Sequence, residues 1–360
     1  MSTTSRIAPR TRPSMADVGR LANVSAQTVS RFFTGTGYVS ATTRTRIEAA
    51  VAELGYRPNH VARAFRVNRT NTIGVLTMGT INYGVSATYA GVTAAAHATN
   101  YSIVISHIDV DIDDPGALEE ARRGLDTLQS LQVDGIILAT QNRHADNLLE
   151  GISDRLPVVT LSGRPKSAAA SVAVDSHQAG LLATRHLIEL GHQRILHIGG
   201  PRNRHETIER ERGYSDAMLE AGLPPLPIIP GTSWSAASGH LAGLSPNLGD
   251  FTAVFAANDP IALGFSSAMR SRGLEAPTDY SIIGVDDMPD TAFFAPPLTT
   301  IRMDFNELGS VAFEMIRHHI QTGQQLDARV LPPMLVVRDS AAPPRSGPAL
   351  SVVLGSASSS

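Results

Sequence analysis

Residues 14–55 read SMADVGRLANVSAQTVSRFFTGTGYVSATTRTRIEAAVAELG. Serines at 14, 25 and 40 each precede a run of apolar residues at helical spacing, and serine is a preferred N-cap. Two short helices separated by a tight turn and supported by a third predict a helix-turn-helix unit. The residues expected to be buried are Met15, Val18, Leu21 and Ala22; Val29, Phe32 and Phe33; and Ile47, Val51 and Leu54.

Charge is distributed unevenly along the chain. Residues 1–70 carry eleven arginines and three acidic residues, whereas the rest carries 19 basic and 30 acidic residues, which leaves a net charge of −3. A basic end on an acidic body indicates that a polyanion binds the end only. An arginine-rich solvated tail would have the same composition, so the residue pattern within the segment has to decide.

The second predicted helix carries side chains that can read a DNA major groove. It begins Ser25-Ala26-Gln27-Thr28, so small and hydrogen-bonding residues lie at its N-terminus. Gln27 can pair bidentately with adenine, and Arg31 with guanine. Nearby hydroxyl groups suit phosphate contacts, namely those of Ser25, Ser30, Thr34, Ser40 and Thr43. A structural three-helix domain is the alternative, but the basic charge favours DNA binding.

Residues 17–31, the pairs Val39-Ser40 and Thr43-Arg44, and residues 54–59 (LGYRPN) resemble the DNA-binding head of the lactose-repressor (LacI/GalR) family. The resemblance implies that Asn59 to Val67 forms a hinge helix in the minor groove, with Phe65 as the wedge where the family usually has Leu. The DNA contacts that we expect are Ser14, Ser25, Ala26, Gln27, Ser30, Arg31, Thr34, Tyr38, Ser40, Thr43, Asn59, Ala62, Arg63, Phe65 and Arg66.

From Thr72 onward, short apolar strands alternate with amphipathic helices. The strands are expected at Ile73–Met78, Ser102–Ser106, Gly135–Ala139, Pro157–Leu161, Val172–Val174, Arg194–Ile198, Ala253–Ala256 and Ser281–Val285. The helices are expected at Ala87–Asn100, Ala117–Leu131, Gln178–Leu190, Glu206–Ala221, Pro260–Arg272 and Asn306–Gln321. This alternation predicts a doubly wound α/β body with parallel sheets in two lobes, and a ligand cleft between them.

The family resemblance extends to about residue 340 through Leu190-Gly-His192, Ala257-Asn-Asp259 and Ile283-Gly-Val-Asp-Asp287. It implies a periplasmic-binding-protein-like effector domain whose lobes share crossover strands near residues 174 and 302. The expected organisation is a disordered basic tail (1–13), the helix-turn-helix domain (14–58), a hinge (59–70), a two-lobed effector-binding and dimerisation domain (71–340; lobe 1 about 71–174 and 303–330, lobe 2 about 175–302 and 331–340) and a disordered tail (341–360).

Side chains near the strand ends predict a sugar site. Hydroxyl-rich ligands need charged or amide groups and a flat apolar surface. Arg210 could instead belong to a solvated helix face, Asn258 and Asp286 could cap local structure, and Trp234 and Phe305 could be core or interface residues. With the resemblance, we expect the effector-binding residues to be Asn82, Tyr83, Ser162, Glu206, Arg210, Trp234, Asn258, Asp286 and Phe305.

Several classes of protein are disfavoured. The absence of cysteine excludes disulfides and thiolate catalysis. We find no nucleophile–base, phosphate-loop or zinc-hydrolase motif, so we expect neither an enzyme nor a bound cofactor or metal. No apolar run approaches the ~18 residues of a membrane span, and no signal-peptide core is evident, so a cytoplasmic protein is expected.

These observations predict a dimeric repressor of carbohydrate-utilisation genes that binds a pseudo-palindromic operator under the control of a sugar. The tail lacks leucine heptads, so a dimer is expected rather than a tetramer. A nucleoside- or nucleobase-sensing regulator and, less favourably, a sugar-binding transport protein are the alternatives. The sequence leaves open the sugar, and whether it induces or corepresses.

Overall fold

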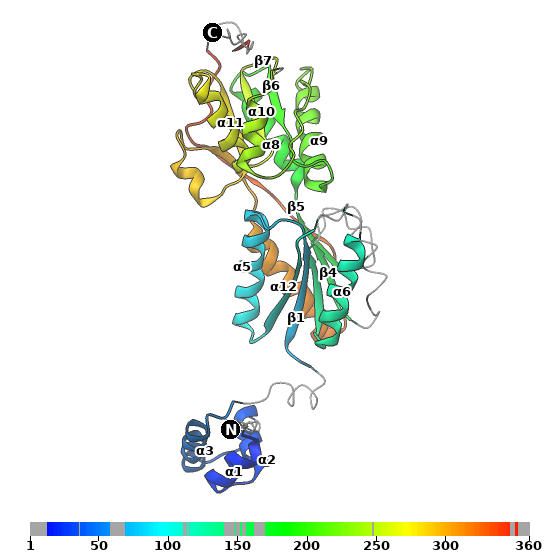
Figure 1. Cartoon of the computed structure of the whole chain (residues 1–360), viewed down its shortest axis with the longest axis vertical. Coiled ribbons are helices and arrows are strands. Elements are labelled where there is room, and N and C mark those ends of the chain that lie inside the picture. The colour runs from blue at the N-terminus through cyan, green and yellow to red at the C-terminus, as the bar shows by residue number, and fades with distance from the viewer. Residues whose placement is uncertain are drawn as a thin grey trace, which may run out of the picture. The chain divides into compact units, whose positions relative to one another are not determined.

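The computed structural model describes residues 13–35, 37–57, 69–110, 114, 116–139, 148, 152, 156–161, 170–246, 248–345 and 350–351. The chain divides into two compact units, Met1–Thr70 and Asn71–Ser360. Figure 1 labels the elements of each unit. Among the described helices, none is both long enough and apolar enough to cross a membrane.

The first unit contains three helices, α1 (Met15–Ala22), α2 (Ala26–Thr34) and α3 (Ala41–Leu54), as the serine spacing predicts. Each helix begins at a serine whose hydroxyl accepts a hydrogen bond from the backbone N–H three residues on: Ser14 from Asp17, Ser25 from Thr28 and Ser40 from Thr43. Such a cap contributes ~1 kcal/mol. The helices end at Asn23, Gly35 and Gly55, all in the left-handed conformation.

These helices share one apolar core, to which each contributes a fully buried side chain: Val18, Val29 and Ile47. Leu21 is an exception to the prediction, because its side chain is 45% exposed. Residues along a helix are offset by 100°, so Leu21 lies roughly 90° from the centre of the stripe that contains Val18 and Ala22. The stripe is therefore narrower than expected.

Two large sheets, beside one of only two strands, form the core of the second unit and confirm the predicted α/β class. The first has the strand order β11-β5-β4-β3-β1-β2, with all neighbours parallel. The second has the order β12-β10-β9-β8-β6, with β12 antiparallel to β10. The strands are β1 Thr72–Met78, β2 Ser102–Ile108, β3 Gly135–Ala139, β4 Val158–Leu161, β5 Ala170–Val174, β6 Ile195–Ile198, β8 Ala253–Ala256, β9 Ser281–Asp286, β10 Thr299–Arg302, β11 Arg329–Leu331 and β12 Met334–Val336.

Helices cover both faces of each sheet (Figure 1). On the first sheet, α5 (Tyr83–Ala98) and α12 (Phe305–Thr322) cover one face and α6 (Ala117–Ser130) the other. On the second sheet, α8 (Ser176–Glu189) and α9 (His205–Glu220) lie opposite α10 (Ala236–Gly243) and α11 (Asp259–Ser271). Burial on both faces explains why the strands read as continuous apolar runs.

The chain passes between the two sheets three times. It leaves the first sheet after β5, returns between β10 and α12, and leaves again between β11 and β12. The two lobes built on these sheets are therefore joined by three separate segments. Such connections allow a change in lobe orientation without unfolding either lobe.

Several short elements were not predicted from the sequence. The helix α10 is rich in small residues and contains two glycines, which lower helix propensity. The strands β7 (Asp250–Phe251) and β11 to β13 have two or three residues each, whereas β10 corresponds to the crossover strand expected near residue 302. Such short segments carry too few residues for a pattern, so pairing with neighbours decides their structure.

The prediction of disorder over residues 341–360 is wrong for the first part of that tail. The carbonyl oxygen of Ala342 lies 2.9 Å from His192 Nε2 and accepts a hydrogen bond of 2.8 Å from Ser281 Oγ. Arg345 pairs with Asp279 at 3.8 Å, and β13 (Leu350–Ser351) pairs with β7. Lobe 2 supplies these partners, which a local sequence pattern cannot reveal.

Candidate functional site

The predicted recognition helix α2 presents its polar residues to solvent. Ala26, Gln27 and Arg31 are exposed, whereas Val29 is buried against the other two helices. Tyr38, in the turn after α2, is 89% exposed. This unit therefore has one apolar side that stabilises it and a polar side that is exposed to solvent.

The hydroxyl groups at the helix starts also serve the structure. Ser14 Oγ donates to Asp17 Oδ2 at 2.7 Å, and Ser40 Oγ donates to Thr43 Oγ1 at 2.9 Å. Ser25 caps α2, and Ser30 lies within that helix. The side chain of Thr34 and the whole of Asn59, Ala62, Arg63, Phe65, Arg66 and Ser162 lie outside the described residues.

A cavity of about 470 Å³ lies between the two lobes of the second unit. Eight of the nine predicted effector residues line it: Asn82, Tyr83, Glu206, Arg210, Trp234, Asn258, Asp286 and Phe305. Asn82, Tyr83 and Phe305 come from lobe 1, and the other five come from lobe 2. The fold thus brings together residues more than 200 positions apart.

Arg210 lies on α9 and is only 4% exposed, so a solvated helix face is excluded. Its Nη1 donates to the carbonyl oxygen of Ala257 at 2.5 Å, and its guanidinium carbon lies 5.5 Å from the centre of the Trp234 ring. Within the described residues, the buried Nε–H has no hydrogen-bond partner. A buried donor of this kind is costly unless a ligand or water accepts from it.

Asn258 combines a capping role with a position in the cavity wall. Its Oδ1 accepts from the backbone N–H of Ile261 at 2.9 Å, which caps α11. Its Nδ2 donates to the carbonyl oxygen of Trp234 at 3.1 Å. The local interpretation of Asn258 is therefore correct, and the same side chain fixes the backbone that carries the cavity's tryptophan.

Carboxyl groups gather on the lobe 2 side of the cavity. Asp286 lies 3.7 Å from Arg210 Nη2; burial raises the pKa of Asp286 to about 7, with Arg210 opposing this shift and Glu206 adding to it. Burial also raises the pKa of Glu206. Behind them, Asp259 accepts hydrogen bonds from Thr300 Oγ1 and the Met288 N–H, and burial together with Asp286 raises its pKa. The wall can thus both donate and accept hydrogen bonds near neutral pH.

Lobe 1 contributes an aromatic wall. The rings of Tyr83 and Phe305 meet edge to face with centroids 6.2 Å apart. Burial raises the pKa of Tyr83, and Asp286 adds to the effect, so its hydroxyl remains a donor. Phe305 is 7% exposed and belongs to the core, which agrees with the alternative to a ligand-binding role. The same residue also lines the cavity. Asn82 caps α5 by accepting from the Val85 N–H.

Asn203 and Arg204 also line the cavity and were not predicted. They follow β6 in the loop before α9, on the cavity side of lobe 2. An ideal Cβ on Gly79, which directly follows β1 in lobe 1 and has φ of 82°, would lie 2.6 Å from Arg204 Nη2. Arg204 therefore reaches across the cleft. The position of the loop beyond a strand's carboxyl end could have identified both residues.

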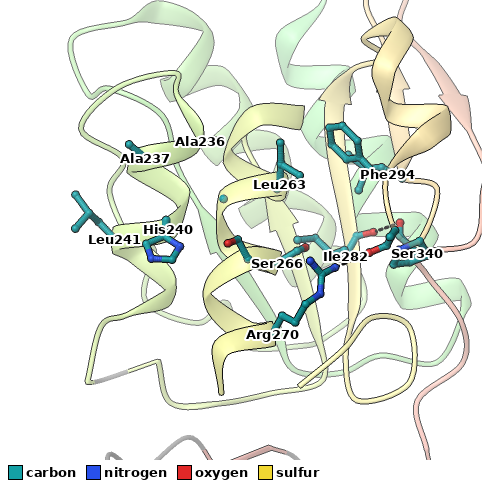
Figure 2. Close-up of a pocket in the computed structure, with 16 residues that line it drawn as sticks. Ala236, Ala237, His240, Leu241, Leu263, Ser266, Arg270, Ile282, Phe294 and Ser340 are labelled. Carbon is teal, nitrogen blue, oxygen red and sulfur yellow. Dashed lines mark hydrogen bonds between the residues drawn. The ribbon is translucent and has the colours of Figure 1, made fainter. Parts of the chain in front are cut away.

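A second cavity of about 680 Å³ lies on lobe 2, along the face covered by α10 and α11 (Figure 2). Its wall is mostly apolar and includes Leu241, Leu263 and Phe294. Leu241 is 63% exposed and Leu263 is 44% exposed. We call this region the α10–α11 face. Exposed apolar side chains gathered in this way mark interaction surfaces.

Comparisons with known proteins match both units. Residues 14–59 match the model described as bacterial regulatory proteins, lacI family, and residues 184–341 match that of a periplasmic binding protein-like domain. The ribose operon repressor of Escherichia coli K12 is 33% identical over 335 residues, which cover 91% of this chain and 99% of that protein. The transcriptional repressor PurR of Vibrio campbellii is 32% identical over 335 residues, which cover 90% of this chain and 97% of that protein.

Solved structures agree with these matches. The Lac repressor dimer bound to operator and the anti-inducer ONPF superposes with a TM-score of 0.84 at 29% identity, covering 92% of this chain and all of that one. A LacI-family regulator from Enterococcus faecium with bound ribose has a TM-score of 0.66 at 27% identity and covers 76% of this chain and all of its own.

Proposed function

Because this chain belongs to the lacI family of bacterial regulatory proteins, we propose that it is a transcriptional repressor whose operator affinity is set by a sugar bound between the two lobes. The observation that carries the proposal is the interlobe cavity, where Arg210, Asn258, Asp286 and Trp234 converge in a chain with a helix-turn-helix head. The genes it controls would serve carbohydrate utilisation. Its site of action is the cytoplasm, where the chromosome lies.

The cavity's chemistry supports a sugar. Hydroxyl groups donate and accept at once, and the cavity offers a buried Arg210 donor together with the carboxyl group of Asp286. Trp234 supplies a flat surface for the C–H face of a sugar ring. A volume of about 470 Å³ is within the range of small-molecule sites. Among the similar structures, one regulator holds ribose and another, the transcriptional regulator CelR, is in complex with cellobiose.

The DNA-binding surface that we propose is the polar side of α2 with its flanking turns. Gln27 and Arg31 are exposed there and reach base edges, while Ser14, Ser25, Ser30, Ser40 and Thr43 contact phosphates. The helix-turn-helix places one recognition helix per half-site, so two copies bind a pseudo-palindrome. The predicted hinge contacts at Asn59, Ala62, Arg63, Phe65 and Arg66 belong to the same proposal.

The α10–α11 face is our proposed contact between the two copies. Leu241 and Leu263 would be covered by the same surface of the partner, as a two-fold axis requires. The Lac repressor structure with a TM-score of 0.84 is a dimer on its operator. Dimerisation would set the spacing of the two heads, so this face bears on DNA affinity as well as on assembly.

Sugar binding would act on DNA through the relative orientation of the lobes. An effector shifts such an equilibrium only as far as its affinities for the two states differ, and a coupling of 1–3 kcal/mol is typical. An inducing sugar favours the state that releases operator, and a corepressing sugar favours the other. By linkage, operator DNA changes the sugar affinity by the same factor.

Two measurements on the full-length protein test this function. In-vitro selection from random duplexes identifies the preferred DNA, and a thermal-shift screen of pentoses, hexoses, disaccharides and nucleobases identifies the effector. We expect a pseudo-palindrome and a sugar that changes the operator Kd. Selection of no preferred duplex would overturn the regulator proposal. A nucleobase that stabilises the protein where no sugar does would favour the nucleobase-sensing alternative.

A further inference from the structure

Two consecutive aspartates at the end of β9 have unusual backbone conformations. Asp286 has φ of 114° and Asp287 has φ of 52°, so both lie in the left-handed region that disfavours side chains with a Cβ. Non-glycine residues persist there only when the surrounding structure holds them, and such positions cluster at ligand sites and switches. The turn they form directs Asp286 into the cavity and Asp287 away from it.

Asp287 binds two arginines. Its Oδ2 accepts from Arg302 Nε at 2.7 Å, and its Oδ1 accepts from Arg338 Nη2 at 2.6 Å. The carboxyl group is only 6% exposed. Burial raises its pKa, but hydrogen bonds from Arg338 and Arg302 outweigh this, so the pKa of Asp287 is lowered and the group stays ionised.

The two arginines follow or end strands of lobe 2 that lead to interlobe connections. Arg302 is the last residue of β10, three residues before α12 begins in lobe 1, and it is the register partner of Asp286. Arg338 lies two residues after β12, by which the chain re-enters lobe 2. Arg338 Nη1 also donates to the Leu298 carbonyl oxygen at 2.8 Å. Asp287 therefore contacts the start of one connection through Arg302 and, through Arg338, the segment that follows the strand β12 by which another connection enters lobe 2.

We propose that Asp287 is a positioning residue that couples occupancy of the cavity to the orientation of the lobes. Contact of the sugar with Asp286 displaces the two-aspartate turn, and Asp287 transfers that displacement to Arg302 and Arg338. The inference rests on the proposed function. It adds a defined physical link between the cavity and the interlobe connections, which the cavity residues alone do not provide.

The principal test is Arg302→Gln, because the Arg302 side chain is 47% exposed and its loss leaves Arg338 on Asp287. Arg185→Gln is the matched control, since Arg185 forms an exposed ion pair of 2.6 Å with Glu220 away from the connections. Asp287→Asn is a second variant that weakens both contacts. Circular dichroism melting establishes that each variant folds.

The readout is the ratio of operator Kd values with and without saturating sugar, measured with the selected duplex and the sugar of the panel that changes the wild-type Kd most. Wild-type coupling should fall within the usual 5- to 150-fold range. We expect Arg302→Gln to reduce this ratio ~3-fold or more and Asp287→Asn to bring it close to one. Arg185→Gln should keep the wild-type ratio, and sugar should still bind all variants.

The outcomes separate the coupling proposal from the function on which it rests. If no sugar changes the wild-type operator Kd, the sugar-controlled function fails and the coupling proposal fails with it. If the wild type responds and a folded Arg302→Gln responds equally, only the coupling proposal is overturned. An equal loss of the ratio in Arg185→Gln would also overturn it, because the effect would then not be specific to the connections.

Discussion

The indole ring of Trp234 occupies the space into which any side chain at Gly200 would project. An ideal Cβ at Gly200 would collide with Trp234 Cη2 and Cζ3 and would lie 2.7 Å from Thr207 Oγ1. Gly200 is thus required by the ring's position. Because the ring also faces Arg210, this one glycine helps to set the geometry of the cavity wall.

Gly200→Ala should therefore displace Trp234 and weaken sugar binding by ~10-fold, since the stacking surface moves relative to Arg210. Trp234 is the only tryptophan in the chain, so its fluorescence emission reports the displacement directly. We expect a shifted emission maximum and a weaker response to sugar. Wild-type emission together with wild-type sugar affinity would contradict the assigned role of the ring.

Arg210→Lys should reduce sugar affinity about 10- to 100-fold, as expected from the loss of 1.5–3 kcal/mol for a hydrogen bond to a charged group. Lysine keeps a positive charge near Asp286 but lacks the planar fork and stacks less well on Trp234. Calorimetric titration measures the change. Arg212→Lys is the control, because Arg212 lies on the same helix with a half-exposed side chain and pairs with Glu209.

Asp286→Asn should change how stability depends on pH. The folded pKa of Asp286 is about 7, above the ~4 of an unfolded aspartate, so the folded state holds an extra proton between these values. Its contribution is present at low pH and is lost as pH rises through 7. Relative to Asp286→Asn, the wild type should gain ~1 kcal/mol in unfolding free energy from pH 8 to pH 6.

Urea unfolding at both pH values measures that difference. The comparison between the two proteins cancels the histidines whose pKa values burial lowers, such as His197 at about 4, because both proteins contain them. Parallel stability curves for the wild type and the variant would show that Asp286 does not titrate in this range.

Substitutions in the head should separate base reading from phosphate binding. Gln27→Ala and Arg31→Ala should relax base preference, with ~1–3 kcal/mol of lost discrimination for each contact. Arg46→Ala, on the exposed side of α3, should weaken binding to all sequences alike and reduce the salt dependence. Binding to the selected duplex and to its single-base variants, over a range of salt concentrations, measures both effects. An operator affinity independent of salt would contradict the phosphate contacts.

Leu263→Asp should dissociate the dimer, because it places a charge on the α10–α11 face. Leu219→Asp is the matched control, since Leu219 is 64% exposed on α9, away from that face. Sedimentation velocity at micromolar concentration should show a monomer for the first variant and a dimer for the second. A stable tetramer in the wild type would contradict the expectation drawn from the tail.

The sequence by itself determined the local parts of this protein. Serines at 14, 25 and 40 define where the head's helices begin because capping is a contact over three residues, and apolar runs from Thr72 onward define the main strands. It also selected residues that the fold then brought around one cavity. The assignment of those residues as sugar ligands remains a prediction.

Only the tertiary structure decided how distant groups act together. Asn258 both caps α11 and binds the backbone of Trp234, and the Leu21 side chain lies at the surface. The first residues of the tail bind lobe 2 through Ala342, and Asp287 lies between Arg302 and Arg338. These features depend on contacts between segments tens to hundreds of residues apart. Periodicity and capping report only on neighbours along the chain, whereas burial, register and shared hydrogen bonds arise once the two lobes have formed.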